Sequence, residues 1–447
     1  MGSQVSIKDI RSKTGTTTVT TGPSIKTLAS GLRLVVREKH EAQVATADIW
    51  VGTGSAHETP EVGGISHFLE HMLFKGTERF GLGQIEREIE NMGGVCNAGT
   101  SYDFTHYYLT MPSENIESGI EMLSEMVTHS SLDPEELEKE RLVILEEYRR
   151  KQDDPDAILF EELYEQLYEA GPYHNSVIGT EETIRSITRE QMADYYRRHY
   201  CPENSLLIVT GDVDAAEVFA TAEKFFKDYT RPYEPLLPQG PVDTRFARAK
   251  THHHSKPTGG ELYYSLSCGA PGADETELIV ALDVAQYILG QGRASILYQE
   301  IKERLGLAST IACYYSTQRY ASAFMIDATL EPGNKDELRK AIDACLEKFC
   351  TEPISVEHFE RARRLLASGH LFSLETTGSC SVQTGYYHNL TGNFDFFEDY
   401  IARLDALSPE DVKKAFEVLR SGYEWIEVTV GPDGVAGENG ALGGENP

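Results

Sequence analysis

Two segments of the chain lie 220 residues apart and follow the same pattern. The first runs from Ile187 to Gly211 and the second from Leu407 to Gly431, and they align without a gap. In both, a helical stretch, a turn, a buried apolar strand and a closing glycine coincide. A period this long is typical of a duplicated domain, because solenoid repeats recur every ~20 to 50 residues. The sequence therefore predicts two related domains in one chain.

Each domain is expected to be of the α+β class, with a mostly antiparallel sheet flanked by helices. The chain has 447 residues, and a single core seldom grows past about 250 to 300 residues. We expect a first domain over residues 1–230 and a related second domain over 246–432. The proline-rich stretch 231–245 is predicted to be the linker, and the glycine- and glutamate-rich residues 433–447 a disordered tail.

Local patterns predict the elements of the first domain. Strands are expected at 24–40, 44–51, 104–111 and 205–210, from apolar alternation or short apolar runs between turn signals. Helices are expected at 65–75, 82–92, 113–129, 134–151, 157–169, 189–199 and 215–228. The helix from Pro134 begins clearly, because Asp133 is a good N-cap and proline suits the first helical position. The segment His252–His254 is expected to lie in a surface linker.

The composition limits the classes of partner. The formal net charge is −30 and the sequence pI is about 4.9. Nucleic acid is therefore not the expected partner, because phosphate binding requires clustered Lys and Arg. An acidic protein can attract basic substrates if its carboxylates line a cleft, and an acidic surface that serves only solubility is the alternative.

The cysteines and the apolar runs indicate the compartment. The chain has seven cysteines, which are scattered and include no C-x-x-C pair, so a disulfide framework is not expected. No secretory signal and no apolar segment of membrane-spanning length is visible in the sequence. We expect a cytoplasmic protein, or an organelle-matrix protein if a presequence was removed.

The stretch His67-Phe68-Leu69-Glu70-His71 carries the strongest chemical signal. On a helix, positions i and i+4 share a face, so His67 and His71 can present two imidazole nitrogens to one cation. The order H-x-x-E-H is the inverted form of the metalloprotease zinc signature, with Glu70 as candidate general base. Catalytic zinc usually has three protein ligands and a water, so a third ligand is required. Two helical histidines that bind no metal are the alternative.

The helix expected after Pro134 offers the third ligand. Its candidates are Glu138, Glu140, Glu146 and Glu147. Glu140 and Glu147 are two helical turns apart and therefore share a face. A carboxylate near the core is costly without a partner, and a cation would stabilise it. An exposed acidic face of a glutamate-rich helix is the alternative.

These motifs together resemble the pitrilysin/insulinase family of zinc metallopeptidases, the inverzincins. The resemblance rests on the run from His67 to Thr77 and on Glu140 to Glu147, in which Glu147 follows His71 by 76 residues. It extends to Gly93-Gly94, to Asn97-Ala98, to 204–211 and to the duplicated second half. The pattern is closest to processing-peptidase-like members with chains of this length.

The resemblance implies a role for each matching residue. His67, His71 and Glu147 match the zinc ligands, so one Zn2+ per chain is expected. Glu70 matches the general base that takes a proton from the metal-bound water, and Glu140 matches a carboxylate that orients the site. The substrate-binding residues that match the family are Phe74, in the pocket wall, and Asn97 and Ala98, on an edge strand along which the peptide would lie.

One departure from the family pattern suggests a partner. Active members usually have an Arg and a Tyr, seven residues apart, which grip the substrate. Lys302 and Ser309 occupy those positions here. Lysine lacks the planar guanidinium group of arginine, and serine is too short to replace tyrosine. We therefore expect a heterodimer with a paralogous subunit that carries the Arg/Tyr pair. A shifted alignment with Arg304 in the role, or a homodimer, are the alternatives.

The resulting hypothesis is a zinc-dependent endopeptidase that is the catalytic subunit of a heterodimer. It would hydrolyse peptides or unfolded segments, with basic peptides among the expected substrates, bound as an edge strand in a closed acidic chamber. One alternative is the beta subunit of a mitochondrial-type presequence processing peptidase. Another is a non-catalytic scaffold subunit that retains a zinc site.

Overall fold

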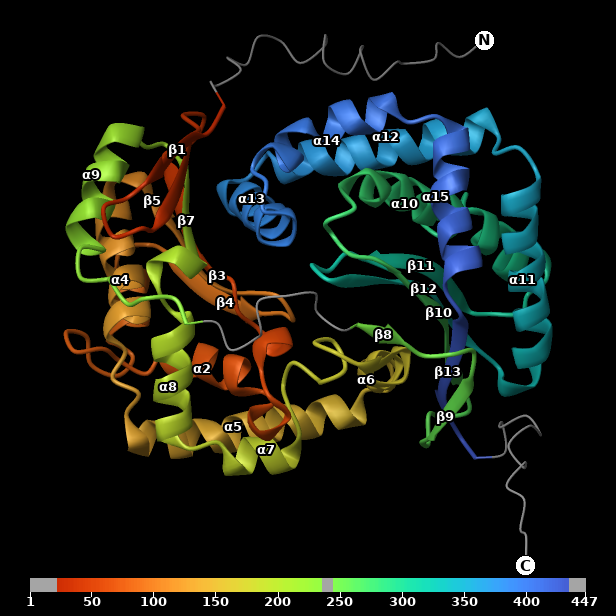
Figure 1. The fold of residues 1–447 in the computed structure, drawn as a ribbon, viewed down its shortest axis with the longest axis horizontal. Helices are drawn as coiled ribbons and strands as arrows, with labels where there is room; N and C mark the ends of the chain where they lie inside the picture. The colour runs from red at the N-terminus through yellow and green to blue at the C-terminus, as the bar shows by residue number, and fades with distance from the viewer. Residues whose placement is uncertain (1–21, 235–243, 434–447) are drawn as a thin grey trace, which may run out of the picture.

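Two sheets, each flanked by helices, make up the two halves of the molecule (Figure 1). The computed structural model describes residues 22–234 and 244–433. Most of the expected linker 231–245 and nearly all of the expected tail 433–447 therefore lie outside the described residues. The predicted α+β fold with two duplicated, mostly antiparallel sheets is confirmed.

The first half contains a sheet of six strands in the order β1-β2-β7-β3-β5-β4. The β2 and β7 strands are parallel, and the other neighbours are antiparallel. Because β4 ends the order, one of its edges pairs with no strand of this sheet. The strands are β1 (Ser24–Thr27), β2 (Arg33–Glu38), β3 (Val44–Val51), β4 (Val95–Thr100), β5 (Thr105–Pro112) and β7 (Ser205–Gly211).

The second half repeats this order in five strands, β11-β12-β10-β13-β9. Its parallel pair, β13 with β9, corresponds to β7 with β2. The strands are β9 (Thr251–Ser255), β10 (Leu262–Pro271), β11 (Thr310–Ser316), β12 (Ala321–Leu330) and β13 (Trp425–Gly431). A small separate sheet pairs β6 (Tyr168–Ala170) with β8 (Arg245–Phe246).

Helices lie against both sheets. Those of the first half are α2 (Ile65–Leu73), α3 (Gln84–Asn91), α4 (Ile116–His129), α5 (Pro134–Asp153), α6 (Pro155–Leu167), α7 (Glu181–Ser186), α8 (Arg189–His199) and α9 (Ala215–Phe225). Those of the second half are α10 (Thr276–Leu289), the π-helix η5 (Tyr298–Arg304), α11 (Lys335–Thr351), α12 (Val356–Ser373), α13 (Thr377–Thr391), α14 (Asp395–Ala406) and α15 (Pro409–Gly422).

The internal repeat predicted from the sequence is present in the structure. The first residues of α8 and α15 are 220 positions apart, and so are both ends of β7 and β13. Thr188 and Ser408 cap the two helices in the same way, each accepting a bond from the backbone amide three residues later. The same local sequence signals therefore define the same helix-turn-strand unit in both halves.

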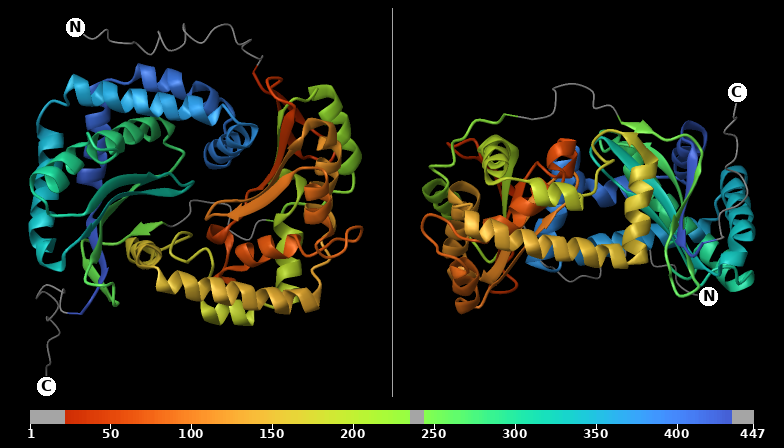
Figure 2. Two further views of the ribbon diagram at one scale, coloured as in Figure 1. Left: turned by 180° about the vertical axis from the view of Figure 1, so that it is seen from behind. Right: turned by 90° about the horizontal axis from the view of Figure 1, so that it is seen from below.

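Each half contributes one helix to the sheet of the other half. Helix α6 packs on β10 and β13 of the second sheet, and α13 packs on β3 and β7 of the first (Figure 2). Gly385 of α13 lies so close to Trp50 of β3 that an added Cβ would come within 2.1 Å of the indole ring. The inner face of each sheet is thus buried by a helix from the opposite half.

The turns of two edge hairpins also meet. Asp103 lies between β4 and β5, and Arg319 lies between β11 and β12. The buried Asp103 carboxylate accepts bonds from the Arg319 backbone amide, at 3.1 Å, and from the Tyr173 hydroxyl, at 2.8 Å. This contact connects the two sheets at their pseudo-equivalent hairpins.

Several local expectations need correction. The stretch 24–40 contains two strands, because the turn at Ser30-Gly31 folds β1 back on β2. His252–His254 is part of strand β9 and is not a surface linker. On the edge strand, His252 and His254 both pair with Glu162 of α6, at 2.8 and 2.7 Å, a partner the sequence spacing did not reveal. Among the described residues, no helix has the length and apolarity needed to cross a membrane.

Candidate metal centre

Helix α2 carries two of the three candidate ligands. Its apolar side chains, among them Phe68, Leu69 and Met72, are buried in the core of the first half. His67, Glu70 and His71 lie on the partly exposed side, as the spacing predicts. The motif is therefore held on a rigid helix whose other face is fixed by packing.

The start of α2 is held by a buried carboxylate. Gly64, the N-cap, has a left-handed φ of +90°, and an added Cβ would come within 2.4 Å of the Ile178 carbonyl oxygen. Glu58 accepts bonds from the backbone amides of Gly64, at 2.6 Å, and Ser66, at 2.8 Å. A carboxylate at this end also interacts favourably with the helix dipole. Burial raises the pKa of Glu58 to about 7.

Helix α5 brings the third candidate. Asp133 caps this helix by accepting from the amides of Glu135 and Glu136, as predicted. Buried Leu137, Ile144 and Leu145 anchor the helix in the same core as α2. Glu140 and Glu147, two turns apart, then both face α2.

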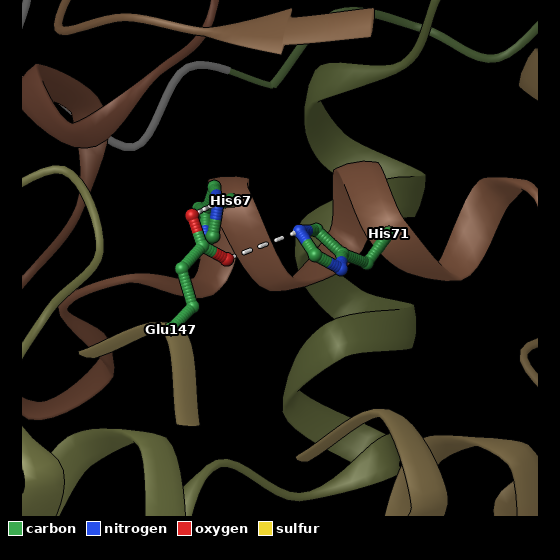
Figure 3. Close-up of side chains that lie close together, drawn as sticks. All are labelled: His67, His71 and Glu147. Carbon is green, nitrogen blue, oxygen red and sulfur yellow. Dashed lines mark ion pairs between the residues drawn. The ribbon is translucent and has the colours of Figure 1, made fainter. Parts of the chain in front are cut away.

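His67, His71 and Glu147 lie close together (Figure 3). One oxygen of Glu147 is 3.7 Å from His67 Nε2, and the other is 3.7 Å from His71 Nε2. One ligand atom from each of the three residues lies within 4.8 Å of the other two. Tetrahedral zinc, with bonds near 2.0 to 2.2 Å, holds its ligand atoms about 3.4 Å apart, so small side-chain adjustments suffice. Two imidazoles and one carboxylate are a donor set that suits zinc.

Glu140 orients His71. Its Oε1 lies 2.8 Å from His71 Nδ1, and its Oε2 lies 2.8 Å from Lys75 Nζ. When Nδ1 carries the proton and donates to this carboxylate, the lone pair of His71 is on Nε2, the nitrogen that faces Glu147. Burial acts against ionisation of Glu140, but the bonds from His71 and Lys75 prevail and lower its pKa.

Glu70 lies beside the ligands on α2 and binds the edge strand. Thr100 of β4 donates to Glu70 Oε2 at 2.5 Å. Burial raises the pKa of Glu70, although the Thr100 bond and His71 oppose the rise. Burial also lowers the pKa of His67 to about 3, with His71 adding to the effect. A carboxylate with a raised pKa beside a neutral imidazole is suited to accepting and returning a proton.

The three expected substrate-binding residues lie next to this cluster. Phe74 follows α2 and packs against Tyr107, with ring centroids 6.2 Å apart. Asn97 and Ala98 lie on β4, the strand whose outer edge is unpaired in its sheet. The Asn97 side chain accepts a bond from the Ala98 amide at 2.9 Å. A peptide that pairs with Ala98 would replace this local bond.

The other candidates from the sequence lie elsewhere. Glu138 pairs with Arg141, and Glu146 pairs with Arg149, so neither faces the histidines. Lys302 is in η5, and its Nζ donates to the Ser309 carbonyl at 2.5 Å. These two residues contact each other in the second half of the chain.

Three contributors were not anticipated from the sequence: Glu58, Lys75 and Thr100. Glu58 lies a short distance before the motif, but in a loop whose path the sequence pattern does not predict, so only the fold shows that its carboxylate reaches the α2 amides. Thr100 approaches Glu70 because β4 runs beside α2. Lys75 lies just beyond the end of α2, four residues after His71, where its Nζ reaches the Glu140 carboxylate.

Comparison with protein families finds two matches. The family "Insulinase (Peptidase family M16)" matches residues 33–181, which include every candidate residue of the cluster. The family "Peptidase M16 inactive domain" matches residues 186–366. Together the two matches extend over most of the chain.

Individual proteins are similar along nearly the whole length. A zinc protease of Bacillus subtilis (strain 168), YmxG, is 29% identical over 388 residues, covering 86% of this chain and 93% of that protein. A probable mitochondrial-processing peptidase subunit beta of Arabidopsis thaliana is 26% identical over 407 residues, covering 87% and 75%. The crystal structure of a protease from Helicobacter pylori has a TM-score of 0.85 at 25% identity, covering 92% of this chain and 99% of that one.

Proposed function

Because the chain belongs to the insulinase family of peptidases, M16, we propose that it is the catalytic, zinc-bearing subunit of a heterodimeric endopeptidase. The chain is a zinc protease of this family. The finer proposal concerns which residues act, what they bind and which partner completes the site. One observation carries it: His67, His71 and Glu147 offer ligand atoms within 4.8 Å of one another, beside Glu70.

We assign His67, His71 and Glu147 as ligands of one Zn2+ per chain. A zinc ion held by these three residues would supply Lewis-acid chemistry, lowering the pKa of a water molecule and polarising a peptide carbonyl. Glu140 holds His71 in the tautomer whose Nε2 faces the metal position. Glu70 takes the proton from the attacking water and delivers it to the leaving amine, while Thr100 keeps its carboxylate in place.

We propose that the substrate peptide binds along the unpaired edge of β4. A peptide added there as an extra strand is held by backbone hydrogen bonds and tolerates varied side chains. Asn97 and Ala98 provide the pairing edge, and Phe74 forms part of the pocket wall. Since α2 lies against β4, the strand passes beside Glu70. This arrangement suits unfolded or short peptides in a closed chamber.

The heterodimer proposal rests on Lys302 and Ser309. Lys302 bonds with the Ser309 backbone in the second half, and neither can replace an Arg/Tyr pair that grips substrate. We propose that residues 1–230 form the catalytic unit and 246–432 the non-catalytic unit, joined by 231–245. A second, paralogous chain would bring the Arg and Tyr. A cytoplasmic or organelle-matrix location is part of the same proposal.

A second candidate is the beta subunit of a presequence processing peptidase. It is favoured by similarity to the Arabidopsis thaliana protein of that name and by the net charge of −30, which suits basic peptides. The scaffold alternative is weaker, because Glu70 and all three ligands are present together.

The test is a peptidase assay with zinc analysis. The purified chain is assayed on quenched fluorescent peptides alone, and again after mixing with a paralogue from the same genome that has the Arg/Tyr pair and lacks the zinc motif. We expect one zinc per chain, weak activity alone and strong activity after mixing. Full activity of the chain alone would contradict the heterodimer, and zinc binding without cleavage in either sample would favour the scaffold.

A further inference from the structure

A histidine reaches the free edge of the first sheet across a glycine. His106 of β5 pairs with Gly99 of β4, and the two residues share the inner face of the sheet. An added Cβ on Gly99 would come within 3.3 Å of His106 Nε2 and 3.5 Å of Cδ2. The Nε2 side of the imidazole therefore lies directly over the glycine. Any side chain at 99 would cover this nitrogen.

A buried carboxylate orients the imidazole from behind. Asp48 of β3 has no exposed surface, and its Oδ1 lies 3.1 Å from His106 Nδ1. Two neighbouring rings stack on the histidine and restrict its plane: Trp50, with centroids 4.3 Å apart, and Tyr108, with centroids 5.5 Å apart. The His106 side chain keeps 13% of its surface exposed. Its orientation is thus fixed, and only one nitrogen is left for another molecule.

This nitrogen is close to the proposed chemistry. Gly99 is followed by Thr100, whose hydroxyl holds Glu70. A peptide that pairs with β4 therefore places one residue opposite Gly99, next to the residue that bonds the base. The side chains of a strand alternate between faces, so every second peptide side chain projects to the face on which His106 lies.

We propose that His106 is a specificity-determining residue whose Nε2 accepts a hydrogen bond from a donating side chain of the bound peptide. Asp48 fixes the orientation of the ring, and Gly99 leaves Nε2 accessible because it has no side chain. The proposal rests on the proposed function, because it needs a peptide on the β4 edge. In the neutral imidazole that donates Nδ1–H to Asp48, Nε2 is an acceptor. Lysine and arginine side chains fit best, since the Asp48 carboxylate behind the ring is negative; hydroxyl and amide side chains also fit.

The test uses peptide libraries that vary one position at a time, comparing lysine with norleucine, its apolar isostere. Two variants remove the contact in different ways. Gly99→Ala covers Nε2 while His106 itself is kept, at the cost of a small shift of the ring, and the backbone angles at 99 allow alanine. The double variant His106→Phe with Asp48→Asn keeps the stacked ring and leaves no buried charge unpaired. Tyr108→Phe, on the same face of β5, is the matched control.

Two readouts are measured on folded protein, checked by circular dichroism. The first is kcat/KM for each peptide. The second is binding of the same peptides to the Glu70→Gln form of each variant, by fluorescence anisotropy, which needs no cleavage. We expect lysine to be preferred about 3- to 10-fold at one position, the range of one net hydrogen bond. Both contact variants should lose this preference, and Tyr108→Phe should keep it.

The contrary results are distinct. A preference that persists in both contact variants, no preference at any position, or a preference for Asp or Glu overturns the assignment of His106. Absence of cleavage in every form, together with a binding preference that depends on His106, overturns the proposed peptidase activity and leaves the His106 contact supported.

Discussion

The Nδ1 atom of His71 lies 2.8 Å from Oε1 of Glu140, so a carboxylate of helix α5 holds this proposed zinc ligand of helix α2. Such partners raise the basicity of a ligating histidine and fix its orientation. We predict that Glu140→Gln weakens zinc affinity about 10- to 100-fold, measured by competition with a chromophoric chelator. Glu138→Gln is the control, because the exposed Glu138 side chain pairs with Arg141 rather than with His71. Equal affinity in the two variants would contradict the role of Glu140.

Glu70 is predicted to be needed for cleavage and not for metal binding. The Glu70→Gln side chain can still accept from Thr100 but cannot take a proton from water. We expect the variant to bind zinc as the wild type does and to lose at least 100-fold in kcat, since general-base catalysis contributes about 10²- to 10⁴-fold. Metal analysis and peptidase assays on one preparation check both statements. Near-normal cleavage would show that another group is the base.

Two glycines allow a matched test of how α2 begins. Gly64 and Gly83 are both N-caps with left-handed φ, +90° and +64°. Alanine at Gly83 meets no atom within 4 Å, whereas at Gly64 it would meet the Ile178 carbonyl oxygen at 2.4 Å. Gly83→Ala should cost about 1 kcal/mol of unfolding free energy, from the left-handed angle alone. Gly64→Ala should cost several times more and lower zinc affinity as well. Chemical denaturation measures both, and equal costs would rule out the clash.

Asp283 should make stability depend on pH. It is partly buried in α10 and accepts a bond from Tyr400 at 2.8 Å, and desolvation raises its pKa to about 7 from an ordinary value of 3.8. The folded protein therefore holds this proton more tightly than the unfolded chain. The resulting stabilisation is complete below pH 3.8 and is lost as the pH rises through 7.

Asp283→Asn removes this dependence. Relative to the wild type, the variant should gain up to about 3 to 4 kcal/mol in unfolding free energy between pH 4 and pH 8. Urea denaturation at the two pH values gives the difference. Asp399→Asn, at an exposed position of α14, is the control and should show no such gain. A wild type and an Asp283→Asn variant with parallel pH profiles would contradict the raised pKa.

The elements that were predicted correctly have local signals. The capped start of α5 at Asp133, the strand β3 and the helix α8 follow from short-range patterns, and the 220-residue repeat gave the architecture of two halves. The grouping of His67, His71 and Glu147 was expected because helical spacing and family resemblance agree. Neighbouring residues in the sequence determine the helices and strands in these cases, whereas Glu147, 76 residues after His71, was placed beside the histidines by the family resemblance.

The features that were missed depend on residues far apart in the sequence. Glu162 is the partner of His252 and His254 only because α6 crosses to the second sheet. Asp103 meets Arg319 because two hairpins from different halves touch at their turns. Asp48 reaches His106 through strand pairing between β3 and β5. Spacing along the chain contains no information on such contacts until the topology is known.

The reciprocal packing of α6 and α13 has a consequence for how the two halves depend on each other. These helices occupy equivalent places in the repeat, about 220 residues apart, and each covers the sheet of the other half. A single repeat unit would therefore leave one sheet face exposed to water unless a second copy covered it. The two halves of this chain therefore depend on each other to bury their sheets, as two subunits with exchanged helices would.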